Sequence, residues 1–158
     1  MIEDEAPHGW RRAARVLPVD SEGRVLLLHG WDPHRPEQPF WFTIGGGAEP
    51  DESLAQAAAR ELREEVGAVV DPADLGEPVG ELRHQFSWAG KTLWQHEVYF
   101  AWAAAHFTAD FDGMDRAEQN SIDQARWWSP DELAADGSGT SPNLTATMRK
   151  AIAAVTRR

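Results

Sequence analysis

The 158-residue chain contains no cysteine. Disulfide bonds, thiolate metal ligands and a cysteine nucleophile are therefore excluded, and a reducing compartment is compatible with the sequence. Basic residues are also in deficit, because 15 lysines and arginines stand against 26 aspartates and glutamates and the net charge is -11. Such a chain is a poor partner for the phosphates of duplex DNA or RNA. A small phosphorylated substrate remains compatible, since a bound metal can reverse the local sign of an acidic site.

Long hydrophobic runs are absent as well, because no apolar run approaches the length of about 18 residues that a transmembrane helix needs. The opening residues, MIEDEAPHGWRR, lack the basic and apolar segments of a signal peptide. We therefore expect a cytoplasmic protein with no membrane partner. The length and the 42% hydrophobic content fit one domain over residues 1–158. The sequence leaves a monomer and a homodimer both open.

Periodicity and turn signals predict an alternation of strands and helices. Strands are expected at residues 10–20, 24–30, 40–44, 79–88, 92–105 and 125–128. Helices are expected from Asp51 or Ser53 to Gly67, from Ser129 onward and over residues 142–155, with an acidic loop over residues 110–123. This order predicts an α/β fold in which helices cover both faces of a mixed sheet.

The helix that ends at Gly67 carries carboxylates at the edge of its apolar face. On a helical wheel with Leu54 at zero, that face spans about 40° to 140°. It is made of Ala55, Ala58, Ala59, Leu62 and Val66. Glu65 falls at about 20° and Glu61 at about 340°, next to this face. A solvated helix face is the ordinary explanation of a charge run, but it does not account for a carboxylate at a core edge, which is costly without a compensating charge.

The two arginines of this helix do not offer that compensation on the wheel. Arg60 falls at about 240° and Arg63 at about 180°, on the far side. A bound divalent cation is the simpler compensation for the group formed by Glu61, Glu64 and Glu65. Oxygen-only ligands favour Mg²⁺ or Mn²⁺ over zinc, which normally recruits histidine or cysteine.

The same segment resembles the Nudix box of the Nudix hydrolases, G-x5-E-x7-R-E-U-x-E-E-x-G-U, in which U is a bulky aliphatic residue. In this chain the pattern runs from Gly46 through Glu52 and the residues RELREEVG to Ala68. All of its charged and glycine positions are filled. The departures are Ala68, where a larger aliphatic is usual, and Gly45, where many members carry proline. The flanking segments FWFTIGGG and ARWWSPDEL also resemble the family.

The resemblance implies a Nudix-type α/β/α sandwich and an enzyme. The implied reaction is metal-dependent hydrolysis of a phosphoanhydride bond in a nucleoside diphosphate linked to another moiety. Glu61, Glu64 and Glu65 are the implied ligands of Mg²⁺ or Mn²⁺, and Glu52 and Arg60 are implied to orient the site.

The glycines before the helix carry a further expectation. Gly45, Gly46 and Gly47 form a flexible turn on the ordinary explanation. On the functional one they let the backbone approach a substrate and direct amides at its phosphates.

Three carboxylates are alternative proton acceptors. Nudix sites often add a carboxylate from outside the box, for which Glu118 is the first expectation and Glu97 the second, while Glu64 within the box is another. A solvated loop acid is the competing explanation for Glu118. A non-catalytic nucleotide-binding or sensor module of the same fold is the alternative function, but it predicts an eroded box. The identity of the diphosphate substrate lies outside the box.

Overall fold

The computed structural model describes residues 9–139, 141 and 143–158. Within them, seven strands form one sheet around a central strand. The strands are β1 (Arg11–Val19), β2 (Val25–Gly30), β3 (Phe40–Phe42), β4 (Ile44–Gly47), β5 (Gly80–Trp88), β6 (Lys91–Ala103) and β7 (Ile122–Trp128). The order is β3-β2-β1-β6-β5, with β4 paired to β1 and β7 to β2. Strands β1 and β6 run parallel and the other pairs run antiparallel, so the sheet is mixed, as predicted.

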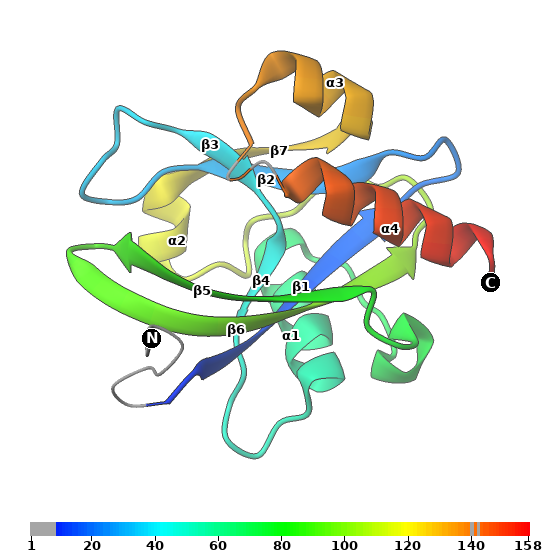
Figure 1. Cartoon of the computed structure of the whole chain (residues 1–158), viewed down its shortest axis with the longest axis horizontal. Helices are drawn as coiled ribbons and strands as arrows, with labels where there is room; N and C mark the ends of the chain where they lie inside the picture. The colour runs from blue at the N-terminus through cyan, green and yellow to red at the C-terminus, as the bar shows by residue number, and fades with distance from the viewer. Residues whose placement is uncertain (1–8, 140, 142) are drawn as a thin grey trace, which may run out of the picture.

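Helices cover both faces of this sheet (Figure 1). They are α1 (Leu54–Val66), the short 3-10 helix η1 (Pro72–Leu75), α2 (Arg116–Ser121), α3 (Pro130–Asp136) and α4 (Leu144–Thr156). On one face, α1 buries Leu62 against Ala14 and Val16 of β1. On the other face, α3 and α4 bury Leu133 and Met148. The predicted α/β/α arrangement is therefore confirmed.

Local sequence signals explain the ends of α1. Ser53 is the N-cap and forms a capping box with Gln56, and Gly67 closes the helix in the left-handed conformation at φ 77°. The buried face is wider than the predicted one, since Ala57 is buried together with Glu65. None of the helices within the described residues is both long and apolar enough to cross a bilayer.

The register of the β5–β6 hairpin, which the sequence does not specify, pairs Gly80 with Tyr99 and Trp88 with Lys91. Its turn places Ala89 at φ 51° and Gly90 at φ 79°. Two successive residues at positive φ are typical of the tight hairpin turns that match the twist of a strand pair. This register fixes which residue of β5 lies opposite each residue of β6.

Three predictions about local structure are corrected. Residues 110–123 are not one loop, because Asp115 and Glu118 form a capping box that starts α2 and because β7 begins at Ile122. The predicted strand 40–44 is split between β3 and β4. The glycines at 45–47 belong to β4 rather than to a free turn. Helix α4 begins at Leu144, and Pro142, its predicted first residue, lies outside the described residues.

Candidate metal and hydrolytic site

A side chain at each of the three glycines of β4 would meet a different neighbour. Gly45 has φ 142°, and a side chain there would collide with the carbonyl of Ala14. A Cβ on Gly46 would lie 2.8 Å from Glu61 Oε1, and one on Gly47 would collide with the guanidinium of Arg11. The glycines therefore admit a neighbouring strand, a carboxylate and an arginine close to the backbone.

Glu65 is the buried carboxylate of α1, with only 2% of its surface exposed. The amide nitrogen of Gly45 donates a hydrogen bond of 3.0 Å to Glu65 Oε1. Burial and the neighbouring Glu61 raise the pKa of Glu65 well above its ordinary value, although Arg15 opposes the rise. The position at the core edge, predicted from the helical wheel, is thus where the structure places this side chain. The Gly45 amide is engaged by Glu65 and not free for a phosphate.

Glu118 reaches the same place from α2, far away in the sequence. The segment before α2 crosses the end of α1 at Gly113, where a Cβ would lie 2.8 Å from the carbonyl oxygen of Glu64. Asp110 donates its backbone N–H to the carbonyl of Val66 at 2.9 Å, and Met114 is buried in the core. Because of this crossing, Glu118 lies next to Glu61 and Glu65 of α1.

Glu61, Glu65 and Glu118 each present a carboxylate oxygen, and these three oxygens lie within 4.8 Å of one another. We call these residues the acidic group. Burial raises the pKa of Glu118, with contributions from Asp115, Glu61 and Glu64, against a backbone hydrogen bond from Asp115. Glu64, a predicted ligand, lies at the margin of this group, half-exposed and 3.2 Å from Arg60 Nη1.

Arg60 contacts two carboxylates of α1 although the helical wheel puts it on the far side of the helix. Its Nη1 lies 3.1 Å from Glu61 Oε1 and 3.2 Å from Glu64 Oε2, and its Nη2 donates to the carbonyl of Gly47 at 3.1 Å. The prediction that Arg60 projects to the far side is wrong, because the helical wheel fixes where a side chain starts and a long arginine can turn back along the helix. Hydrogen bonding to Glu52 raises the pKa of Arg60 further, so it stays charged.

Glu97 lies away from the acidic group. Strand alternation puts it on the sheet face opposite its neighbour Val98, which packs with α1. Its Oε1 accepts hydrogen bonds from Arg15 Nε at 3.1 Å and Nη2 at 3.0 Å, and from Gln95 Nε2 at 2.9 Å. Its Oε2 accepts one from the Tyr99 hydroxyl at 2.6 Å. Burial alone would raise the pKa of Glu97, but Arg15 and Tyr99 hold it below its ordinary value.

Arg15 is a residue that the sequence analysis missed. Burial alone would lower its pKa, but the charges of Glu97 and Glu65 raise it, so Arg15 remains a cation that Glu65 of the acidic group senses electrostatically. The alternation of β1 offers the signal that could have found it, since Arg15 shares a sheet face with the buried Leu17 and Val19. Arginine is rarely buried without a paired charge, so an arginine on the buried face of a strand indicates a specific partner.

The donor chemistry of the acidic group fits a hard divalent cation. Three carboxylates, of which Glu65 is buried, present oxygens close to one another, and hard oxygen ligands are those that Mg²⁺ and Mn²⁺ prefer. The neighbouring cations are already committed, Arg60 mainly to Glu52 and Arg15 mainly to Glu97. The negative charge of the acidic group is therefore only partly balanced by these arginines, which favours a bound divalent cation.

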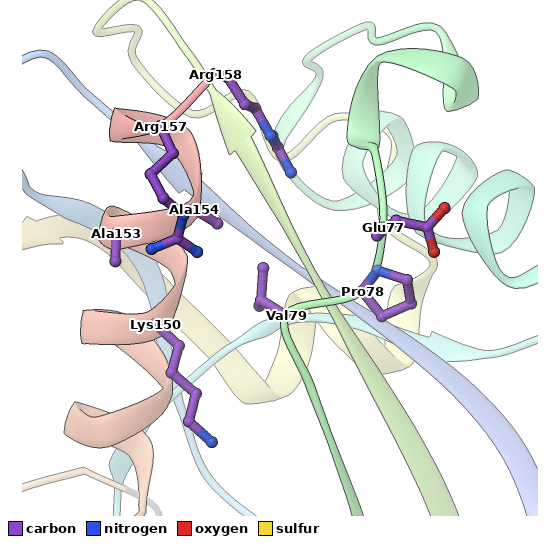
Figure 2. A pocket seen from close by; sticks show the side chains of 8 residues that line it. All are labelled: Glu77, Pro78, Val79, Lys150, Ala153, Ala154, Arg157 and Arg158. Carbon is purple, nitrogen blue, oxygen red and sulfur yellow. The ribbon is translucent and has the colours of Figure 1, made fainter.

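A hollow of about 430 Å³ lies elsewhere, between α4 and the start of β5 (Figure 2). Lys150 and Arg157 point into it from the helix, and Glu77 lies on the opposite wall. The guanidinium of Arg158 is occupied, because it donates to the carbonyls of Ala101 at 2.7 Å and Leu75 at 2.9 Å. No member of the acidic group lines this hollow.

Comparison with known proteins agrees with the box and the fold. The family model for the NUDIX domain matches residues 9–154. A CTP pyrophosphohydrolase of Escherichia coli is 35% identical over 118 residues, which cover 72% of this chain and 73% of that protein. An RNA pyrophosphohydrolase of Erythrobacter litoralis is 31% identical over 135 residues, which cover 78% of this chain and 79% of that protein.

A solved structure extends the agreement to the whole fold. A MutT protein from Methanosarcina mazei superposes with a TM-score of 0.64 at 18% identity, covering 98% of this chain and 100% of that one. The expectation of a Nudix-type hydrolytic enzyme is confirmed by the sequence relatives. The chain belongs to the NUDIX domain family.

Proposed function

We propose that this chain is a Mg²⁺- or Mn²⁺-dependent pyrophosphohydrolase that cleaves a phosphoanhydride bond in a small nucleotide derivative, such as a nucleoside diphosphate linked to another moiety. The observation that carries the proposal is the acidic group, three carboxylates within 4.8 Å beside a glycine strand, one of them buried. The names of the relatives, a CTP and an RNA pyrophosphohydrolase, support the same class of bond. The net charge of -11 favours a small substrate over duplex nucleic acid.

The proposed metal ligands are Glu61, Glu64 and Glu65, with Glu118 close enough to join them. A bound divalent metal supplies neutralisation of the diphosphate charge and a more acidic water. Glu65 is held for this role by the Gly45 amide. The strand around Gly45 lets the substrate approach the acidic group closely.

Glu118 is the proposed proton acceptor. A water oxygen forms a bond to phosphorus, its proton passes to the Glu118 carboxylate, and the bridging P–O bond breaks with the electron pair leaving on the departing phosphate. A raised pKa suits this role, because a base works best when its pKa lies near the working pH. Glu64 is the second choice, since it borders the group. Glu97 is the least suited, because its oxygens already accept hydrogen bonds from Arg15, Gln95 and Tyr99.

Arg60 and Glu52 are the proposed orienting residues. Glu52 also accepts a hydrogen bond from the backbone of Glu49 at 2.9 Å, so the loop before α1 is tied to Arg60. Residues that hold ligands in this way affect metal affinity and turnover without touching the reacting atoms.

A substrate panel with Mg²⁺ tests the proposal. It contains nucleoside triphosphates, dinucleoside polyphosphates, a nucleotide sugar and a non-nucleotide diphosphate, with release of phosphate, pyrophosphate and nucleoside monophosphate measured. We expect turnover of at least one nucleotide and none in the variant Glu65→Gln. A nucleotide that binds without being cleaved by the metal-loaded wild type would support the non-catalytic binding module instead.

A further inference from the structure

Arg15 lies where three strands of the sheet meet. Its position in β1 pairs with Gly45 of β4 on one side and with Tyr99 of β6 on the other. Only 17% of its side chain is exposed. A guanidinium in such a place can bridge two strands, because its donors form a planar fork with fixed directions.

On the β4 side, Arg15 holds the backbone that carries the Gly45 amide. Its Nη1 donates to the carbonyl of Gly45 at 2.9 Å and to that of Thr43 at 3.3 Å. These carbonyls flank the peptide whose N–H is donated to Glu65 Oε1. The direction of that N–H therefore depends on where Arg15 holds its two neighbours.

On the β6 side, Glu97 fixes Arg15. Glu97 is 5% exposed, and it binds both Nε and Nη2 of Arg15 through one oxygen. The ion pair is not needed to join the strands, since β1 and β6 already pair continuously from Arg11 with Gln95 to Val19 with Ala103. A buried ion pair contributes little net stability compared with apolar residues of the same size, so a positional role accounts better for its presence.

We propose that Arg15, held by Glu97, is a positioning residue for the metal centre: by fixing the carbonyls of Thr43 and Gly45 it aims the Gly45 amide at Glu65 and thereby sets the orientation of that carboxylate. This inference rests on the proposed role of Glu65 as a metal ligand. In this arrangement Glu97 influences the metal centre indirectly, because it holds Arg15, which holds the backbone around Gly45.

The test uses the full-length chain labelled with ¹⁵N and compares wild type with Arg15→Met and Arg15→Lys. Two quantities are measured: hydrogen exchange of the Gly45 amide, and the dissociation constant for Mn²⁺ from the signal of free Mn²⁺ in electron paramagnetic resonance. For Arg15→Met we expect faster exchange at Gly45 and Mn²⁺ binding about tenfold to a hundredfold weaker. Arg15→Lys should fall between, because an ammonium can reach one carbonyl but lacks the fork.

Tyr99→Phe is the matched control. It removes the hydrogen bond to Glu97 Oε2 and leaves the contacts of Arg15 with Glu97 Oε1 in place. We expect its Gly45 exchange and its Mn²⁺ affinity to stay close to those of the wild type. A general loosening of the sheet, in contrast, would affect Tyr99→Phe and Arg15→Met alike and would overturn the inference.

The remaining outcomes are also decisive. A folded Arg15→Met protein with wild-type exchange at Gly45 and wild-type Mn²⁺ affinity refutes the inference. If Arg15→Met does not fold, because Glu97 is left buried and unpaired, the double variant Arg15→Met/Glu97→Met is measured with the same expectations. If the wild type binds no Mn²⁺, the proposed function fails, whereas the Gly45 exchange still decides whether Arg15 positions that peptide.

Discussion

Arg60 donates two hydrogen bonds to Glu52, from Nε to Oε2 at 2.7 Å and from Nη2 to Oε1 at 2.9 Å. A fork of this kind fixes both side chains in direction as well as distance. The contact joins the loop after β4 to the middle of α1, and Arg60 also holds Glu61 and the carbonyl of Gly47. The Arg60–Glu52 pair therefore holds Glu61 of the acidic group beside Gly47 of β4.

Glu52→Gln keeps the shape of this side chain and removes the charge that holds Arg60. We expect turnover about tenfold to a hundredfold lower in a folded protein, because an orienting contact is lost but no proposed ligand is. Initial rates and thermal melting check this. The control Arg149→Met breaks an exposed pair with Asp131, also 2.7 Å long, and should change neither quantity appreciably. Unchanged turnover in Glu52→Gln would rule out the orienting role.

Gly46→Ala should weaken metal binding while the fold persists. The new Cβ would lie 2.8 Å from Glu61 Oε1, at the end of a flexible side chain that can move aside. We expect little change in melting temperature and Mn²⁺ affinity about tenfold lower, on the scale of other displaced ligands. Gly80→Ala is the control, since no atom lies within 4 Å of its added Cβ. Wild-type Mn²⁺ affinity in Gly46→Ala would show that Glu61 does not need its present position.

Removing the metal should abolish turnover on every substrate. Excess chelator is expected to stop the reaction, and added Mg²⁺ or Mn²⁺ to restore it, because carboxylates alone cannot neutralise a diphosphate. A ligand that binds only the folded chain also stabilises it, by about 2.7 kcal/mol at a concentration one hundred times its dissociation constant. Melting with and without Mg²⁺ measures this second effect. Full turnover in excess chelator would refute the metal assignment.

Local patterns predicted most of the fold and part of the site. The capping box at Ser53 and the left-handed Gly67 define α1, and the wheel placed Glu65 at the core edge, where it is 2% exposed. The capping box of Asp115 and Glu118 is equally visible in the sequence, but the prediction places it in the acidic loop over residues 110–123.

The rest of the site depends on contacts between distant segments. Glu118 joins Glu61 and Glu65 because the chain passes close to α1 at Gly113, and no local pattern encodes that approach. The same holds for Arg15, whose partner Glu97 is 82 residues away. A helical wheel of α1 shows only the residues of that helix, so it cannot show that Arg15 of β1 opposes the rise in the pKa of Glu65.

Glu64→Gln and Glu65→Gln should each lower turnover by about a hundredfold or more. Both changes remove a charge from a site in which oxygen ligands hold the cation, whereas glutamine is nearly as good a helix former as glutamate. Steady-state rates with saturating Mg²⁺ measure the loss of turnover, and far-ultraviolet circular dichroism shows whether the helix content is kept. Gln56→Glu, on the exposed side of α1, tests whether any change of charge on this helix has the same result. Wild-type turnover in both Gln variants would place the site elsewhere.

The pH dependence of stability should differ between the metal-free wild type and Glu65→Gln. Burial and Glu61 raise the pKa of Glu65 above its ordinary value of 4.5, so the folded chain holds this proton more tightly than the unfolded chain. The stability gained is complete below the ordinary pKa and is lost as the pH rises through the raised one. Glu65→Gln should therefore be as stable as the wild type or more so at neutral pH. Urea unfolding from pH 4 to pH 8 with chelator present measures this, and a difference that grows in the wild type's favour with pH would contradict it.

Hydrolysis in ¹⁸O-labelled water tests the bond that breaks. The oxygens of the acidic group suit two adjacent phosphates, so we expect water to attack phosphorus directly, with no covalent intermediate on the protein. One phosphate-containing product should then carry the label on phosphorus, and a nucleoside monophosphate should appear when the substrate is a nucleoside diphosphate derivative. Mass spectrometry of both products locates the label, and attack at either phosphorus satisfies the prediction. Label on a sugar or alkyl carbon, or a trapped phosphoryl-enzyme, would reject the mechanism while leaving the fold unchanged.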